Sequence, residues 1–200
     1  GGEARRIRAP DEGLLYGCGR ARQRYTVAIE HLDALRDRPA ETRDGRSIRL
    51  TANVGLVSDL RLVDQHGADG VGLFRTEMLA FAHRGFPSEE EQAELYEIAA
   101  KSMAPRTVTI RTLDLGGDKE MPNASGGLED NPQLGCRSIR LSLANQGIFK
   151  AQLRAIYRAS VAGNVRLMLP MITSIDELRS AKVLIAESIQ DLERAGIPYD

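Results

Sequence analysis

The fold of this chain is decided by the stretch Thr107-Val-Thr-Ile-Arg-Thr-Leu-Asp-Leu-Gly-Gly-Asp-Lys119. Its first half alternates the β-branched residues Val108 and Ile110 with polar residues, which predicts a short buried strand. Its second half places two glycines between acidic residues, and such a segment is typical of a loop. Arg111 lies where the strand should end, and the glycines beyond it let a ligand approach the backbone. The stretch predicts an anion site at a strand end, with an ordinary surface arginine at a strand-to-loop junction as the alternative.

The composition excludes several classes of protein. Of the 200 residues, 42% are hydrophobic and 28% are charged, which is typical of a soluble globular domain rather than a disordered segment. The formal net charge is −1, so no strong field favours a nucleic acid or a membrane surface as partner. No apolar run reaches the ~20 residues of a membrane-spanning helix. Cys18 and Cys136 form neither a disulfide framework nor a Cys-x-x-Cys pair, and we expect a cytoplasmic protein.

Residues 1–38 read as the end of an upstream domain and a linker. Residues 1–10 are rich in glycine and arginine and show no useful period. From about Asp11 to Arg38, apolar residues recur at steps of three and four, which predicts a long amphipathic helix ended by Pro39. We interpret this helix as a linker that packs on a neighbouring domain, with a coiled-coil partner helix as the alternative.

From residue 39 onward, strand and helix patterns alternate. We expect four strands, at residues 48–53, 70–74, 108–112 and 166–171. Helices are expected at about residues 58–66, 88–103, 135–143, 148–161 and 174–194. Their predicted N-caps are Ser58, Ser88 with Glu91, and Ser174 with Glu177. Strands that are each followed by a helix predict parallel βα units, arranged either as an open doubly wound sheet or as half of a (β/α)₈ barrel.

Arginines stand at the positions where barrel enzymes carry their site residues. The strand ends read Asn53, Arg75 and Arg111, and Arg137 opens the helix after the long third loop. Guanidinium stays charged when it is desolvated, and it binds phosphate or carboxylate through two parallel hydrogen bonds. Three such groups around one mouth repel one another unless an anion lies between them. The alternative is that each arginine pairs with a nearby acid, such as Glu77, Asp114 or Asp130.

Several ordered motifs resemble one known family. They are Ala52-Asn-Val-Gly55, Gly70-Val-Gly-Leu-Phe-Arg-Thr-Glu77, Pro87-Ser-Glu-Glu-Glu-Gln92, Arg111-Thr-Leu-Asp-Leu-Gly-Gly-Asp-Lys119, Glu129-Asp-Asn-Pro-Gln-Leu-Gly-Cys-Arg-Ser-Ile-Arg140 and Leu169-Pro-Met-Ile172. Together they resemble the phosphoenolpyruvate-binding domain of enzyme I, the phosphoenolpyruvate-protein phosphotransferase family of the bacterial sugar phosphotransferase system. The sequence of residues 85–91, Gly-Phe-Pro-Ser-Glu-Glu-Glu, is more similar to the nitrogen-related branch of that family.

The resemblance implies a fold, a reaction and three site residues. The implied fold is α/β, with parallel βα repeats that form the first half of a (β/α)₈ TIM-type barrel over residues 39–200, preceded by the linker helix. Arg75 and Arg111 are implied to bind phosphoenolpyruvate, and Arg137 to help clamp its phosphoryl group. In family members the phosphoryl group passes to a histidine on a separate domain and then to a phosphocarrier protein, with Mg²⁺ bridging substrate and carboxylates.

The resemblance also implies that part of the site lies outside this chain. The family's metal-binding Glu and Asp, and the Cys that protonates the enolate, belong to the second half of the barrel, past Asp200. We therefore expect no catalytic residue, no metal ligand and no independent activity in this chain. We interpret His31, His66 and His83 as structural or solvated, and Cys136 stands where the family usually has an aromatic residue.

Two other interpretations use the same residues. A relative of pyruvate phosphate dikinase or phosphoenolpyruvate synthase would share the fold, but Gly116-Gly-Asp-Lys119 argues against it. A non-catalytic module could retain the arginines as an anion sensor or an assembly element. Because half a barrel has two unpaired strand edges and an apolar inner face, we expect the chain to self-associate, as a dimer or through strand-edge pairing.

Overall fold

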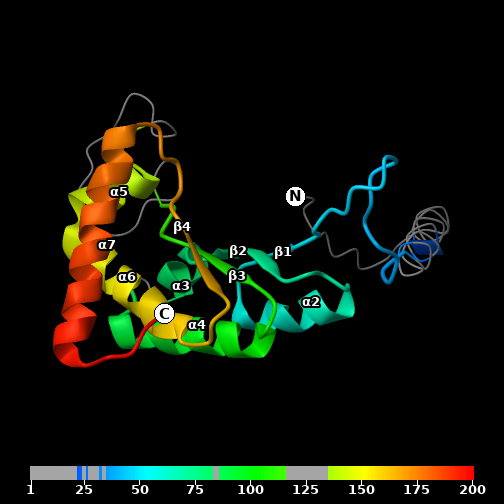
Figure 1. Cartoon of the computed structure of the whole chain (residues 1–200), viewed down its shortest axis with the longest axis horizontal. Helices are drawn as coiled ribbons and strands as arrows, with labels where there is room; N and C mark the ends of the chain where they lie inside the picture. Colours follow the sequence, from blue (N-terminus) through cyan, green and yellow to red (C-terminus); the bar gives the residue numbers. More distant parts are fainter. Residues whose placement is uncertain (1–21, 24–25, 27–31, 33–34, 83–85, 116–134) are drawn as a thin grey trace, which may run out of the picture. The chain divides into compact units, whose positions relative to one another are not determined.

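A computed structural model describes residues 22–23, 26, 32, 35–82, 86–115 and 135–200 (Figure 1). The chain divides into two compact units, residues 1–48 and 49–200. In the first unit, Glu41 and Ser47 form an antiparallel bridge, closed by a turn in which Gly45 has a φ of 81°. Outside the described residues lie most of the helix predicted for residues 11–38, and also Cys18, His31, His83 and Asp130.

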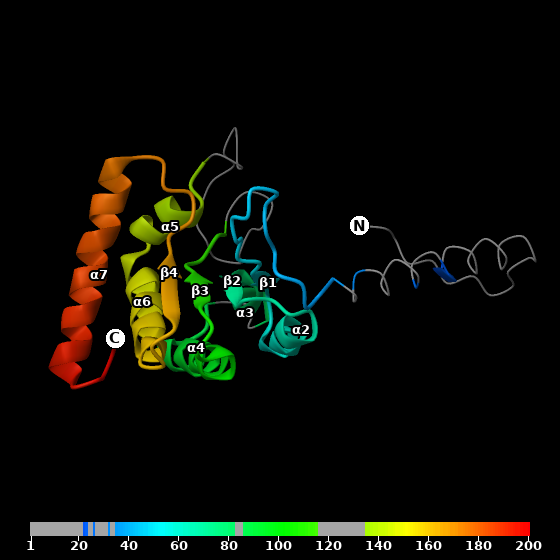
Figure 2. The same ribbon diagram turned by 45° about the vertical axis from the view of Figure 1, so that its right-hand side comes forward.

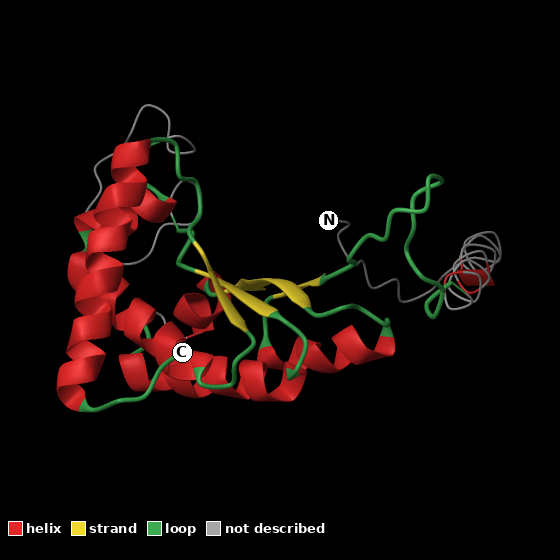
Figure 3. Cartoon of the chain, viewed as in Figure 1, coloured by secondary structure: helices red, strands yellow, loops and turns green. Residues whose placement is uncertain are grey.

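The second unit is built on one parallel sheet. Its strands are β1 (Ala52–Val54), β2 (Val71–Arg75), β3 (Val108–Arg111) and β4 (Val165–Met168). All three neighbouring pairs are parallel, and the order in the sheet is β1-β2-β3-β4 (Figures 1 and 3). A doubly wound sheet reverses its strand order at a switch point, and the described sheet has no such reversal. The fold is therefore α/β, with four parallel strands in the sequential order found in a (β/α) barrel.

Helices follow the strands and lie along one face of the sheet. They are a 3₁₀ turn at Val57–Asp59, α2 (Leu60–Gln65), α3 (Glu77–Ala82), α4 (Glu89–Met103), α5 (Ser138–Ala144), α6 (Gln146–Ser160) and α7 (Ile175–Ala195). Figure 2 shows α6 between the sheet and α7, with α4 beside the lower ends of the strands. This one-sided cover is what right-handed crossovers between sequential parallel strands produce.

The two capping boxes read from the sequence are confirmed. Ser88 caps α4, where its backbone N–H donates to Glu91 over 2.8 Å and the Glu91 N–H donates back to the serine hydroxyl. Ser174 and Glu177 repeat the arrangement at the start of α7. That helix ends at Gly196, whose φ of 66° is the left-handed conformation that glycine adopts without steric cost. Local hydrogen bonds therefore define the start of both helices and the end of α7.

Three boundaries differ from the prediction. The first strand was expected from residue 48, but β1 begins at Ala52, because the N–H of Leu50 donates instead to the Asp69 carboxylate over 2.7 Å. Ser58 is not an N-cap; it lies inside the 3₁₀ turn, and α2 begins at Leu60. The fourth strand ends at Met168 rather than at residue 171, and α3 was not predicted at all. The other elements begin and end within about three residues of the expected positions.

The main core lies between the sheet and helices α2, α4 and α6. Phe74 of β2 and Tyr96 of α4 are fully buried and meet edge to face, with ring centroids 6.2 Å apart. Such an aromatic pair contributes about 0.5–1.5 kcal/mol beyond its buried area. Buried alanines on the facing sides of α4 and α6 allow the two helices to approach closely. This core holds β2 and β3 rigidly, and those two strands carry the candidate site.

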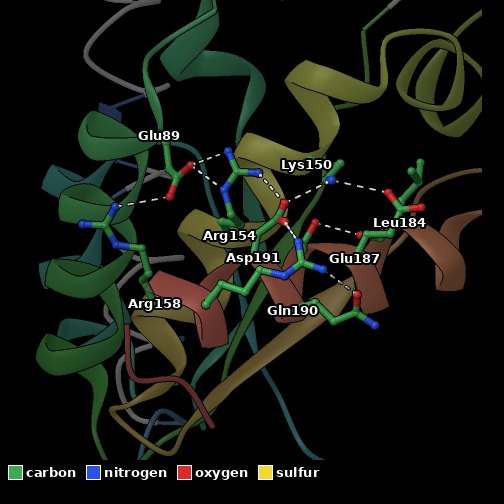
Figure 4. Close-up of polar contacts among 10 residues, drawn as sticks. Glu89, Lys150, Arg154, Arg158, Leu184, Glu187, Gln190 and Asp191 are labelled. Carbon is green, nitrogen blue, oxygen red and sulfur yellow. Dashed lines mark hydrogen bonds and ion pairs between the residues drawn. The ribbon is translucent and has the colours of Figure 1, made fainter. Parts of the chain in front are cut away.

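A network of ion pairs joins the outer helices (Figure 4). Arg154 of α6 donates to Glu89 of α4 through Nε over 2.7 Å and lies 3.6 Å from Asp191 of α7 through Nη1. Lys150 of α6 adds contacts of 3.0 Å to Asp191 and 3.3 Å to Glu187. Single ion pairs in water contribute little, but a shared network of partly buried groups contributes more. The network fixes α4, α6 and α7 relative to one another.

Candidate functional site

Two of the predicted site arginines end neighbouring strands. Arg75 is the last residue of β2, Arg111 is the last residue of β3, and the two are register partners. Side chains in register on adjacent parallel strands project from the same face of the sheet. The structure therefore brings these two residues together at one edge. Asn53, the third predicted strand end, is followed by Val54 within β1 and is exposed.

The Arg75 guanidinium lies beside the end of the first strand. A Cβ placed on Gly55, which follows β1, would come within 3.1 Å of Nη2 of Arg75 and 3.3 Å of Cγ of Met78. A side chain at position 55 would therefore displace the guanidinium. Arg75 is exposed, so its charge stays available to a solute that approaches the strand ends.

Arg111 is held between two carboxylates. Its Nη2 forms a hydrogen-bonded ion pair with Oε1 of Glu77, and its Nη1 lies 3.2 Å from Oδ2 of Asp114. The exposed fractions of the three side chains are 17%, 5% and 14%, so this is a largely desolvated charge cluster. Breaking such a cluster is costly, because an unpaired charge would remain buried.

Arg137 joins the same cluster from the start of α5. Its Nη2 donates to Oδ1 of Asp114 over 3.0 Å, and the hydroxyl of Ser138 donates to the same oxygen. Burial alone would raise the pKa of Asp114, but the hydrogen bonds from Ser138 and Arg137, together with the charge of Arg111, hold it below its usual value. Asp114 is therefore a carboxylate placed between two guanidiniums from different elements.

Two backbone conformations near the cluster are unusual. Ser138 and Met171 have φ values of 52° and 54°, in the left-handed region that residues other than glycine rarely adopt. The Ser138 hydroxyl lies 3.2 Å from Sδ of Met171, and its N–H donates to the carbonyl of Leu115 over 2.9 Å. The residues after β3, at the start of α5 and after β4 thus meet beside Asp114. Strained backbone of this kind is concentrated at functional sites.

Arg111 and Arg137 pair with acids, as the alternative interpretation of the sequence expected, and they share Asp114. Arg111 and Arg137 face the carboxylates of Glu77 and Asp114, so the formal charges of these four groups cancel. The exposed Arg75 adds a positive charge at the neighbouring strand end. Within the described residues, Oε2 of Glu77 is buried and has no hydrogen-bond partner. The arrangement can accept an added anion, because Arg75 is exposed and the remaining charges are already fixed in place.

Sequence reasoning assigned part of this cluster and missed the rest. Glu77 and Asp114 were named only as acids that neutralise arginines, yet Asp114 connects two of the three. Ser138 and Met171 were not singled out. For Ser138 the only available signal was its position directly after Arg137, and a left-handed φ cannot be read from that position.

Metal-binding side chains are not clustered within the described residues. No group of three or more His, Cys, Asp or Glu side chains in this part of the chain could hold a metal ion. The two carboxylates of the cluster are already engaged by guanidiniums. Nor is any helix within the described ranges long and apolar enough to span a membrane. His66, at the end of α2, is exposed.

Comparisons with known proteins agree with these observations. Residues 30–200 match the family model described as PEP-utilising enzyme, PEP-binding domain. The chain is 43% identical over 187 residues to a phosphoenolpyruvate-protein phosphotransferase of Staphylococcus aureus, covering 94% of this chain and 33% of that protein. The proteins of the same name from Staphylococcus carnosus and Listeria monocytogenes are 41% identical over 187 residues and 43% identical over 164 residues, respectively. The chain thus spans about a third of the length of these curated relatives. It belongs to the family of PEP-utilising enzymes, within their PEP-binding domain.

Proposed function

We propose that this chain is part of a phosphoenolpyruvate-protein phosphotransferase and contributes half of its substrate site. The observation that carries the proposal is the register pairing of Arg75 and Arg111 at the strand ends, with Arg137 joined to Arg111 through Asp114. The staphylococcal and listerial relatives carry that activity in their names, and the chain aligns with a third of their length.

In this proposal the three arginines bind phosphoenolpyruvate. The substrate carries a phosphoryl group and a carboxylate, and a guanidinium can bind either one through two hydrogen bonds. Phosphoryl transfer spreads charge over the phosphoryl oxygens, and fixed cations stabilise that charge at no cost in reorganisation. Arg111 is best suited to this role because Glu77 and Asp114 fix its orientation before the substrate arrives. The exposed Arg75 closes on the substrate from the neighbouring strand.

The remaining parts of the reaction are assigned to partners. We propose that the phosphoryl group passes to a histidine on a separate phosphohistidine domain and then to a phosphocarrier protein in the cytoplasm, in sugar transport or its nitrogen-related branch. Since the described carboxylates are occupied by guanidiniums, Mg²⁺ would need ligands from elsewhere, and no step assigned to these residues uses it. The chain alone is expected to bind substrate without turning it over.

The fold proposal extends the described sheet. We propose that residues 39–200 form the first half of a (β/α)₈ barrel and that residues 1–38 carry the linker helix. The sequential parallel order of the four strands supports this arrangement. Because β1 and β4 are the outer strands of the described sheet, we also expect the chain to self-associate through exposed edges.

Calorimetric titration of the chain with phosphoenolpyruvate tests the proposal. We expect saturable binding that Arg75→Ala weakens tenfold or more, and weaker binding of pyruvate, which lacks the phosphoryl group. Arg194→Ala is the matched control: Arg194 is an exposed α7 residue whose partners among the described residues, Asp191 and Gln190, lie on the same helix. Its loss should change the affinity less than twofold. Equal affinities of wild type and Arg75→Ala would refute the proposal. Equal affinities for inorganic phosphate and phosphoenolpyruvate would favour an anion sensor instead.

A further inference from the structure

One buried amide on an outer helix is bonded to both strand ends that carry the arginines. Gln152 lies in α6 and is 4% exposed. Its Oε1 accepts from the backbone N–H of Leu113 over 2.9 Å. Its Nε2 donates to the hydroxyl of Thr76 and to the hydroxyl of Tyr96, each over 3.2 Å. Both amide protons and the amide oxygen are therefore used, as a buried amide requires.

The bonded groups stand directly behind the candidate site. Thr76 follows Arg75, the last residue of β2, and Leu113 comes two residues after Arg111, the last residue of β3. The Thr76 hydroxyl in turn donates to the backbone carbonyl of Arg111 over 3.0 Å. The hydrogen-bond ladder between β2 and β3 ends at Arg75 and Arg111, and beyond that point the contacts with Gln152 connect the two chain segments. A single side chain therefore sets the spacing of the two chain segments that leave the sheet.

The available partners assign a direction to each of the hydrogen bonds described above. The Tyr96 hydroxyl donates to Oε1 of Gln92 over 3.1 Å, so its oxygen is left to accept from Gln152. The Thr76 hydroxyl gives its proton to Arg111, so its oxygen must also accept. Position 152 must consequently supply two donors and one acceptor. An amide can do this, whereas an ionised carboxylate cannot.

We propose that Gln152 is a positioning residue for phosphoenolpyruvate binding, which acts by fixing the relative placement of Arg75 and Arg111. The inference rests on the proposed function, because it concerns the same ligand. Gln152 does not touch the substrate. It acts through Thr76 and Leu113, and a displacement of about 1 Å in a guanidinium is enough to lose much of a two-point contact.

The test compares Gln152→Glu with Tyr96→Phe in the intact chain. Gln152→Glu keeps the shape of the side chain but replaces its donors with acceptors, so the Thr76 hydroxyl must turn away from the Arg111 carbonyl. Tyr96→Phe removes two buried hydrogen bonds of the same group, those with Gln152 and Gln92, and leaves the bonds from Gln152 to Thr76 and Leu113 in place. Urea unfolding measures the stability of each variant, and calorimetry measures the dissociation constant for phosphoenolpyruvate under conditions where the chain is folded.

We expect Gln152→Glu to raise the dissociation constant at least tenfold and Tyr96→Phe to change it less than twofold. The loss should diminish at lower pH relative to wild type, because burial raises the pKa of the introduced carboxyl and its protonated form can again donate one hydrogen bond. A purely structural role does not produce that pH dependence. If Gln152→Glu does not fold, Gln152→Met replaces it in the test, because methionine keeps the volume and lacks the amide donors and acceptor. We expect Gln152→Met to raise the dissociation constant at least tenfold as well.

The outcomes separate this inference from the proposed function. Wild-type chain that fails to bind phosphoenolpyruvate overturns both. Wild-type binding together with unchanged binding by the Gln152 variants overturns the positioning role alone, whatever their loss of stability. If Tyr96→Phe weakens binding as much as Gln152→Glu does, the positioning role is also overturned, because a general loosening of the core would then explain the effect.

Discussion

Removing the Arg111 guanidinium should strongly destabilise the chain, because two carboxylates depend on it. Glu77 is 5% exposed and Asp114 is 14% exposed in the structure, and Arg111→Ala removes the cation between them. Breaking a buried ion pair by removing one partner costs about 3–5 kcal/mol. Asp114 retains Arg137 and Ser138 as partners, so most of the cost should come from Glu77.

Urea unfolding of the chain at pH 7 measures this cost and identifies its source. Arg111→Ala is expected to lower the free energy of unfolding by about 3–5 kcal/mol. Adding Glu77→Gln removes the stranded charge, so the double variant should be more stable than the sum of the single changes predicts, by about 1–3 kcal/mol. Arg179→Ala, which breaks an ion pair with side chains 75% and 88% exposed, should change stability by no more than about 0.5 kcal/mol.

Two results would refute this reasoning. If Arg111→Ala lowers the free energy of unfolding by less than about 1 kcal/mol, the Arg111–Glu77 ion pair contributes no more than a solvent-exposed pair does. Strict additivity with Glu77→Gln would mean that the two charges do not interact in the folded chain. The double variant also isolates the binding role of Arg111, since it should fold better than Arg111→Ala and still fail to bind phosphoenolpyruvate.

The remaining predictions concern the backbone and acid stability. Gly70→Ala should destabilise the chain by more than about 1 kcal/mol, because φ is +144° and the new Cβ would lie 2.6 Å from a backbone carbonyl oxygen. A Cβ added at Gly147 would have no atom within 4 Å, so Gly147→Ala should instead stabilise α6 by about 0.5–1 kcal/mol. Urea unfolding measures the free energy of unfolding of both variants, and equal changes in the two would contradict this prediction. The backbone N–H of Thr173, followed by the guanidinium of Arg140, lowers the pKa of Glu177 from 4.5 to about 2. Its stabilising contribution is therefore present above pH ~4.5 and lost as the pH falls toward 2; a carboxyl titration by NMR that gives an ordinary pKa would contradict this.

Local patterns in the sequence predicted the parts of the fold that local forces decide. The capping boxes at Ser88 and Ser174 were readable because each is complete within four residues. The alternation around Val108 and Ile110 predicted β3, and parallel strand ends implied that Arg75 and Arg111 meet at one edge. Residues alone indicated an anion site, and only the resemblance of several ordered motifs predicted which anion binds there.

Contacts between residues that are far apart in the sequence determine the features that the sequence did not predict. The start of β1 depends on Asp69, which captures the Leu50 N–H from 19 residues away. The left-handed backbone of Ser138 depends on its neighbours in space, among them Met171. Gln152 reads as one more polar residue of an amphipathic helix, and its bonds to Leu113 and to position 76 exist only after the sheet has formed.

The most direct test of the central claim is an NMR titration of the arginine side chains with phosphoenolpyruvate. In chain labelled with ¹⁵N at arginine, the Nε–Hε signals of Arg75, Arg111 and Arg137 should shift together and saturate with one dissociation constant. The signals of Arg179 and Arg194, exposed on α7, should stay in place. Uniform, unsaturating shifts of all arginines, or saturable binding that leaves the signals of Arg75 and Arg111 unmoved, would contradict the claim that these strand-end guanidiniums form the site.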